Sequence, residues 1–225
     1  MAYGIRLHVW GERACFTRPE MKVERVSYEV MTPSAARGIL ESIHWKPAIR
    51  WVVDRIHVLR PIRFQSFRRN EVSVRASADK AERAMRAGST EGLGLVAEDW
   101  RQQRATLFLT DPAYVIEAHF EMTARAGPDD SGAKHLSMFN RRAASGQCFH
   151  RPSLGTRECI ADFRLIAPGA PLPQSTLPPD QMNRDLGWML EDIDFADGAR
   201  SRFFHARLTD GVVDVAACLA EGSVS

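Results

Sequence analysis

Two prolines limit a helix in the first quarter of the chain, and this helix with the strand after it constrains the fold most. Thr32 is a suitable N-cap and Pro33 suits the first helical position. Pro47 disfavours helical backbone at the residue before it, so we predict that the helix ends near His44 or the next residue. The segment "AIRWVVDRIHVLRPIRF" follows directly, is rich in branched and aromatic residues, and predicts a long strand with an interruption at Pro61.

Other periodic segments extend this alternation of helix and strand as far as residue 166. We predict strands at 3–11 and 25–30, then the first helix and the long strand, then a hairpin of 104–110 with 113–123 around Asp111-Pro112, then a helix capped by Asp130 or Ser131 and stopped by Gly146, and finally a strand at 156–166. The order strand, helix, strand, strand, helix, strand predicts an α+β fold. Its first domain, residues 1–166, would be ferredoxin-like and RRM-like, with a split βαβ motif.

The rest of the chain divides into an insertion and a C-terminal part. Residues around 70–100 form an insertion within the basic middle of the chain, with a helix expected at 77–88 and a flexible loop after it. The segment "APGAPLPQSTLPP" at 167–179 carries five prolines and predicts a linker. Three strand-like segments joined by Asp-Gly turns follow it, so we expect a small antiparallel β-meander in a second domain, residues 167–225.

Charge is distributed unevenly, although the formal net charge is only +2. Residues 46–104 hold 13 Lys+Arg against 7 Asp+Glu, a net of +6, whereas residues 167–225 hold 4 against 9, a net of −5. We interpret the basic middle as a surface that binds a polyanion, and a solvated charged surface is the alternative. The chain has no apolar run near the ~20 residues that span a bilayer and no signal-peptide pattern at its start, so we expect a cytoplasmic protein without membrane contact.

Sequence motifs of several common catalytic classes are missing. The seven histidines show no H-x-x-x-H or H-E-x-x-H spacing, and the four cysteines include no C-x-x-C pair. Neither phosphate-binding glycine loop occurs, nor does the G-x-S-x-G serine motif. The sequence therefore predicts no metal and no cofactor.

Two clusters of proton-transfer and cationic residues remain. His44 and Lys46 stand at the end of the first helix, and Lys134 and His135 stand in the first turn of the later one, where free backbone N–H groups attract phosphate. The two helices of a ferredoxin-like fold pack on one side of the sheet, so the clusters can approach each other. Two histidines and a lysine suffice for metal-free RNA cleavage. We predict His44, Lys134 and His135 as a catalytic group.

Positions on the helices also suggest an assignment of acid and base. His135 lies at a helix N-terminus beside Lys134, which disfavours an imidazolium, so we expect it to be the base. His44 lies at a helix C-terminus, where the dipole favours the protonated ring, so we expect it to be the acid. The alternatives are a helix-capping role for His44 and an idle, solvent-exposed Lys134-His135 pair.

Further basic residues predict an RNA-binding surface. The predicted RNA-binding residues are Lys46, Arg60, Arg63, Arg68, Arg69, Arg141 and Arg142. The alternative for the arginines of the long strand is the polar face of a half-buried sheet. We interpret His57 and His119 as structural, and Trp51 and Phe64 as core side chains rather than base-stacking platforms.

Several stretches resemble a known family. They are "RLHVWGERACFTRPEMKVERVSYEV", "MTPSAARGILESIHWKPAIRWVVDRIHVLRPIRFQSFRRNEV" and "GAKHLSMFNRRAASGQCFHRPSLGTRECIADF". They are similar to the CRISPR-associated Cas-five family, Dvulg or type I-C subgroup, of the RAMP superfamily. The resemblance covers about residues 4–72 and 101–166, and it is weak over 73–100 and the acidic C-terminal part.

The resemblance implies a function. Members of the type I-C subgroup are pre-crRNA endoribonucleases that recognise the repeat hairpin, cut at its 3′ base and stay on the 5′ handle of the crRNA beside the other subunits of the interference complex. The family's active residues fall on His44 and on Lys134-His135. The family has Tyr at the first position, "SIYWKP", where this chain has "SIHWKP". By the same resemblance, residues 157–163 are structural.

Two non-catalytic functions are the alternatives. Elsewhere in the family the protein binds the crRNA 5′ handle without cutting it, and a pair of histidines is more than such a role needs. A subunit that binds double-stranded DNA is the other alternative, and the basic middle of the chain permits it.

Overall fold

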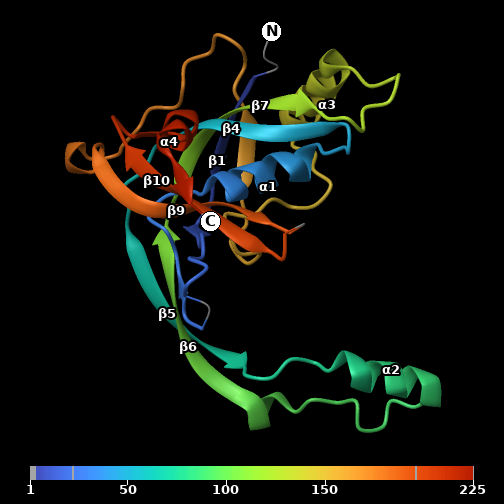
Figure 1. The fold of residues 1–225 in the computed structure, drawn as a ribbon. Helices are drawn as coiled ribbons and strands as arrows, with labels where there is room; N and C mark the ends of the chain where they lie inside the picture. Colours follow the sequence, from blue (N-terminus) through green and yellow to red (C-terminus); the bar gives the residue numbers. More distant parts are fainter. Residues whose placement is uncertain (1–3, 22, 196, 225) are drawn as a thin grey trace. The chain divides into compact units, whose positions relative to one another are not determined.

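A computed structural model describes residues 4–21, 23–195 and 197–224 (Figure 1). The chain forms two compact units. One comprises Met1–Gln65 with Leu107–Ser225, and the other comprises Ser66–Thr106. The expected boundary after residue 166 coincides with neither unit's limit, whereas the predicted insertion at 70–100 lies inside the second unit.

The first unit is built on a central sheet. Among the described residues its strand order is β11 (Val212–Asp214), β4 (Ile49–Val58), β7 (Ala113–Met122), β1 (Ile5–Trp10) and β8 (Asp162–Leu165). Neighbouring strands run antiparallel. Alternation along β1 buries Ile5, Leu7 and Val9, and leaves the residues between them half-buried on the other face. The strand predicted at 3–11 is confirmed over Ile5–Trp10, with residue 3 outside the described residues, and the strand predicted at 156–166 is confined to Asp162–Leu165.

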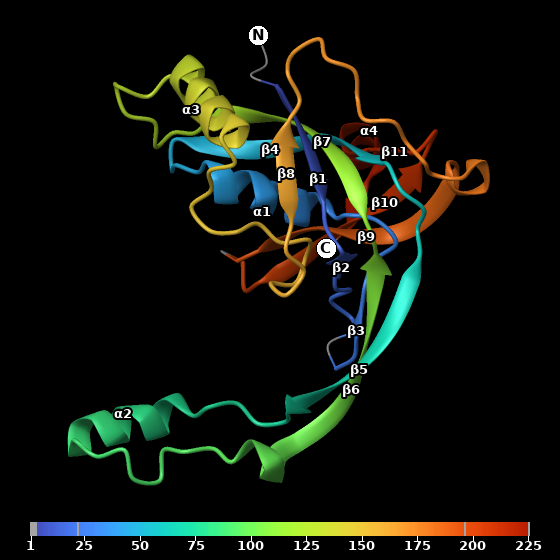
Figure 2. The ribbon, with the colours of Figure 1, turned by 180° about the vertical axis from the view of Figure 1, so that it is seen from behind.

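Two helices pack against this sheet and against each other (Figures 1 and 2). In α1 (Pro33–Ile43) the Thr32 hydroxyl accepts a hydrogen bond from the N–H of Ala35, and the helix ends at His44, as predicted. In α3 (Gly132–Ala144) the cap is Ser131, whose hydroxyl accepts from the N–H of Lys134. The predicted limits of both helices are confirmed, with Ser131 rather than Asp130 as the cap.

An aromatic cluster joins α3 to the sheet. The ring of Trp51 in β4 lies with its centroid 5.3 Å from that of Phe120 in β7 and 4.9 Å from that of Phe139 in α3. These side chains are almost fully buried, so the interpretation of Trp51 as a core residue is confirmed. Phe64, by contrast, is 41% exposed, and its interpretation as core is wrong, because it lies on the face of β5 whose residues are all exposed.

The C-terminal part contributes to two sheets. In the described part of the chain, β9 (Arg184–Asp194), β10 (Arg200–Leu208) and β12 (Ser223–Val224) form a sheet in the order β12-β10-β9. The third strand predicted for the meander is wrong: β11 instead pairs with β4 in the central sheet, and α4 (Val215–Glu221) follows it. Asp214 explains the change, because its carboxylate accepts from the N–H of Ala217 and caps an alanine-rich helix.

The proline-rich segment is attached to the central sheet. The guanidinium of Arg6 donates to the carbonyl of Ala167, and the N–H of Thr176 donates to the carbonyl of Leu59. Leu172 packs against the buried side chains of Leu59 and Val115. A short 3₁₀ turn, η2 (Pro179–Gln181), leads into β9. The predicted linker is therefore an ordered segment of the first unit.

The strands between β4 and β7 in the chain belong to a different sheet. Strand β6 (Arg101–Thr110) pairs with β2 (Arg13–Ala14), β3 (Arg25–Val26) and β5 (Phe64–Val72). The predicted hairpin of β6 with β7 is therefore wrong. Asp111, at a φ of +49°, turns the chain between them, and the apolar β7 enters the central sheet between β1 and β4. The strand predicted at 25–30 shrinks to two residues.

The second unit, Ser66–Thr106, holds the predicted helix of the insertion. Helix α2 (Ala78–Ala87) starts at Ser77, whose hydroxyl accepts from the N–H of Lys80, and ends at Gly88 with a φ of +63°. This helix buries none of its residues. The 3₁₀ turn η1 (Ala97–Trp100) then leads into β6. The helix is therefore confirmed, and local capping rather than packing sets its limits.

We predict that Trp51→Phe destabilises the protein by about 1–3 kcal/mol, because the indole N–H donates a 2.9 Å hydrogen bond to the carbonyl of His44 that phenylalanine cannot replace. Urea unfolding would measure the change. Trp188→Phe is the matched control, since Trp188 is half exposed and its loss should cost less than about 0.5 kcal/mol. Equal losses in the two variants would contradict the importance of this bond.

Candidate active site

The end of α1 holds His44 in one position. Its N–H donates to the carbonyl of Leu40 at 3.0 Å and completes the helix. Its carbonyl accepts from Trp51 in β4, and the carbonyl of Ile43 accepts from the guanidinium of Arg142 in α3 at 3.0 Å. The end of α1 is thus attached to the sheet and to the second helix, and this fixes where the His44 side chain begins.

His135 meets His44 from the first turns of α3. Its N–H donates to the carbonyl of Ser131, and its ring Nδ1 lies 3.0 Å from Nε2 of His44. Both histidines are only 1% exposed, and the ring of Phe120 lies edge-on to that of His135. The two predicted clusters therefore come together, as expected from helices that share one side of the sheet.

This contact limits the charge that the pair can carry. A hydrogen bond between two ring nitrogens needs one N–H and one lone pair, so the bond forms only while at most one of the two rings is an imidazolium. Burial lowers the pKa of His44 to about 4, with further lowering by Arg142, His135 and Lys46. His44 is therefore neutral near pH 7. The expectation that the helix dipole would favour a protonated His44 is wrong, because burial and nearby cations outweigh the dipole.

Asp130 stands on the other side of His135. Its Oδ1 lies 3.2 Å from Nε2 of His135, within ion-pair distance but without the geometry of a hydrogen bond. The N–H of Gly127 donates to its Oδ2 at 3.0 Å, and this bond, together with the nearby His135 and Lys134, lowers the pKa of Asp130. In the sequence this residue stands out only as a possible helix cap. Its position one residue before the true cap and five before a histidine is the signal that could have identified it.

A pocket of about 390 Å³ opens onto this group. It is lined by Lys46, Pro47, Ala48, Arg125, Asp130, Lys134, His135 and Met138. The three cationic residues are exposed, and the ammonium of Lys134 donates to the carbonyl of Asp129 at 3.1 Å. His44 is not among the lining residues, so it reaches the pocket through His135. Cationic side chains can bind a phosphate, and a neighbouring imidazole can take a proton from a hydroxyl beside that phosphate.

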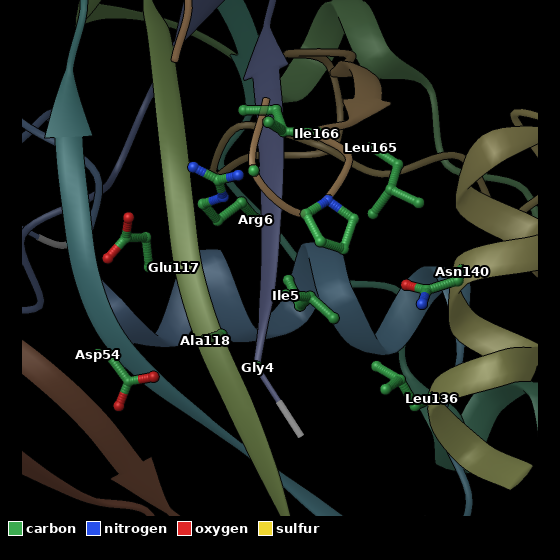
Figure 3. A pocket seen from close by; sticks show the side chains of 12 residues that line it. Gly4, Ile5, Arg6, Asp54, Glu117, Ala118, Leu136, Asn140, Leu165 and Ile166 are labelled. Atoms are coloured by element: carbon green, nitrogen blue, oxygen red, sulfur yellow. The ribbon is translucent and has the colours of Figure 1, made fainter. Parts of the chain in front are cut away.

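A larger cavity, of about 530 Å³, lies against β1 and β7 (Figure 3). Its polar lining includes Arg6, Asp54, Glu117 and Asn140, and none of the predicted site residues. We therefore place the candidate site at the smaller pocket, where the proton-transfer groups are.

The predicted RNA-binding residues are spread over several places. Lys46 lines the pocket, Arg141 is exposed on α3, and Arg142 is half-buried against the end of α1. Arg60 forms an ion pair with Asp111, and Arg63 is exposed. In the second unit Arg68 is exposed, and Arg69 pairs with Glu71 at 2.9 Å.

The remaining histidine predictions concern the sheet. Nδ1 of His119 lies 2.9 Å from the Asp54 carboxylate, and Nε2 of His57 lies 3.3 Å from that of Glu117. These contacts agree with structural roles. Within residues 4–21, 23–195 and 197–224, no three His, Cys, Asp or Glu side chains gather in a way that would hold a metal ion. No helix in the same ranges is long and apolar enough to cross a membrane.

Solved structures agree with the fold. A structure titled "Crystal Structure of CRISPR-associated Protein" superposes with a TM-score of 0.69 at 22% identity, covering 99% of this chain and 96% of the other. The functionally uncharacterized protein SMU1763c of Streptococcus mutans superposes with a TM-score of 0.64 at 21% identity, covering 99% and 97%. At these identities the likeness shows a common fold.

Sequence comparisons identify the family. A family model described as "CRISPR-associated protein (Cas_Cas5)" matches residues 4–216. A protein of Mannheimia succiniciproducens named CRISPR pre-crRNA endoribonuclease Cas5d is 59% identical over 221 residues, 98% of each chain. A protein of the same name from Thermus thermophilus is 41% identical over 232 residues, 95% of this chain and 91% of that one. This chain therefore belongs to the Cas5d family of CRISPR-associated proteins, as its resemblance predicts.

Proposed function

We propose that this chain is an endoribonuclease that cleaves CRISPR precursor RNA, as the names of both curated relatives say of those proteins. The observation that carries the proposal is the buried hydrogen-bonded pair of His44 and His135 at a pocket with cationic residues. The pair supplies a proton acceptor and the cations attract phosphate. A protein that only holds RNA needs the cations but not the pair.

The strand order supports the ferredoxin-like architecture. From β8 through β1 and β7 to β4 the strands are antiparallel neighbours, with α1 between β1 and β4 in the chain and α3 between β7 and β8. This is the arrangement expected of a split βαβ motif, here extended by β11. It places the C-terminal end of α1 beside the N-terminal end of α3, which is what the site requires.

The mechanism that we propose needs no metal. In this scheme His135 donates from Nδ1 to Nε2 of His44, which leaves a lone pair on its Nε2, a buried atom 3.2 Å from Oδ1 of Asp130. That lone pair takes the proton of the ribose 2′-OH, and the 2′-oxygen attacks the adjacent phosphorus. The ammonium of Lys134 stabilises the charge on the phosphorane and protonates the departing 5′-oxygen. The products are a 2′,3′-cyclic phosphate and a 5′-hydroxyl.

His44 acts through His135 in this scheme. Its ring is neutral and buried, so it is suited to accept a hydrogen bond and to keep the His135 ring oriented. Where the resembling family has Tyr, a hydroxyl would have to accept the same bond. The helix position of His44 suggested that it is the general acid, but in our proposal Lys134 has that role.

RNA binding beyond the pocket remains a prediction for Lys46, Arg60, Arg63, Arg68, Arg69, Arg141 and Arg142. Lys46 has the strongest support because it lines the pocket itself. Retention of the 5′ handle and contact with other type I-C subunits rest on the family resemblance alone. Binding of double-stranded DNA has no support from a particular contact.

We predict that His44→Ala, Lys134→Ala and His135→Ala each slow repeat-RNA cleavage roughly 10²-fold or more, the usual scale for a positioned acid or base. RNA affinity should change less than the rate, and thermal melting would show that the variants fold. His205→Ala, a half-buried histidine of β10, is the matched control and should cleave normally. Tight binding without cleavage by the wild type would favour the handle-binding alternative.

A second prediction concerns the nucleophile. Cleavage should proceed in EDTA, yield a 2′,3′-cyclic phosphate, and stop when the nucleotide before the cut carries 2′-deoxyribose, because the 2′-oxygen is the attacking group. Product analysis by mass spectrometry would check this. Normal cleavage of the deoxy substrate would mean that water attacks instead.

A third prediction separates the acid from the base. A substrate with a bridging 5′-sulfur at the cut has a leaving group that needs no proton. It should restore much of the rate of Lys134→Ala and leave His135→Ala slow. Rescue of His44→Ala but not Lys134→Ala would return the acid role to His44.

A further inference from the structure

Asp130 has a constrained position that helix capping does not explain. Ser131 caps α3, whereas Asp130 folds back on its own loop: its carboxylate accepts from the N–H of Gly127, and its N–H donates to the carbonyl of Gly127 at 3.1 Å. Both bonds hold the carboxylate with Oδ1 at 3.2 Å from Nε2 of His135. The loop thus places one negative charge beside the imidazole that faces the pocket.

The charges around the histidine pair make this carboxylate significant. Arg142 from α3 and Lys46 from the loop after α1 act on His44, and Lys134 and Arg125 line the pocket beside His135. From β7 the ring of Phe120 lies edge-on to that of His135, and from β4 the indole N–H of Trp51 donates to the backbone carbonyl of His44.

Asp130 is the only carboxylate among the residues that line this pocket, all of which are described. A buried imidazolium surrounded by cations is costly without a counter-charge. Asp130 can supply that counter-charge.

The contact becomes attractive only when Nε2 of His135 carries a proton, because a carboxylate oxygen and a lone pair repel each other. Nε2 of His135 has no hydrogen-bond partner in the described structure, although Oδ1 is within ion-pair distance. That nitrogen is buried, so its lone pair accepts a proton only from a hydroxyl that enters the pocket beside the carboxylate. A carboxylate in full hydrogen-bond alignment would instead hold a proton on Nε2 and block the base.

We propose that Asp130 is a positioning residue that acts through His135 and stabilises the charged histidine pair formed when the 2′-OH proton has moved. The inference rests on the proposed function. In this step the O–H bond of the ribose breaks and an N–H bond forms at Nε2 of His135. The Nδ1–H of His135 stays donated to His44, the pair gains one positive charge, and Asp130 remains a carboxylate throughout. The proton later leaves to water.

The test is Asp130→Asn, which keeps the shape and the bond to Gly127 but removes the charge. We expect the plateau rate to fall about tenfold, because one unit of proton affinity corresponds to a factor of ten. The acid limb of the pH–rate profile should move about one unit to lower pH, since the pair gives up its proton more easily without the carboxylate. RNA affinity should not weaken, because a negative charge has left a phosphate-binding pocket.

Two further variants keep the result interpretable. Asp130→Glu retains the charge and should return the acid limb toward its wild-type position. Asp129→Asn removes a charge from the adjacent, exposed residue, whose contribution to the site is its backbone carbonyl, and it should leave both rate and profile unchanged. Thermal melting of each variant would exclude unfolding as the cause of a lower rate.

The outcomes distinguish this inference from the proposed function. An inactive His135→Ala with a wild-type rate and profile for Asp130→Asn would overturn the role of Asp130 alone. A lower plateau with an unmoved acid limb would also overturn it, since only a structural role would remain. Full activity of His135→Ala would overturn the proposed mechanism itself.

Discussion

The site depends on how α1 ends. Pro47 prevents the helix from continuing, so the last carbonyls of α1 lack partners within the helix. The indole N–H of Trp51 donates a hydrogen bond to the carbonyl of His44, and the guanidinium of Arg142 donates one to the carbonyl of Ile43. One donor belongs to the sheet and the other to α3, so satisfying these two carbonyls joins three elements at one point. The histidine pair lies at that junction, and its 3.0 Å contact follows from it.

Local signals explain what could be predicted. Thr32, Pro33 and Pro47 determine α1 from within a few residues, and Ser77 and Gly88 do the same for α2. The predictions that failed concern strand pairing, which depends on partners distant in the sequence. Whether β6 continues into a hairpin with β7 depends on β1 and β4, which compete for the same strand edges. Likewise, the residues of β11 have a strand pattern, but that pattern does not say that their partner is β4.

The candidate site shows the same division. The residue types and helix ends pointed to His44, Lys134 and His135, because helix termini can be located from sequence. The protonation of His44 could not be predicted, since it depends on burial by elements far along the chain and on Arg142. Asp130 was missed as a site residue for a related reason. Its orientation comes from a backbone bond to Gly127, and loop conformation leaves little trace in residue type.

The pairing of β11 with β4 has a consequence for how the chain folds. The ion pair of Arg55 with Asp214 joins residues 159 positions apart, so the edge of the central sheet at β4 is covered by a segment that is made long after β4 itself. During synthesis that edge stays open until the ribosome has released β11, and an open edge can pair with another chain. Contacts between residues so far apart in the sequence also slow folding. A nascent chain of this protein is therefore expected to be most prone to aggregation in the interval between the synthesis of β4 and that of β11.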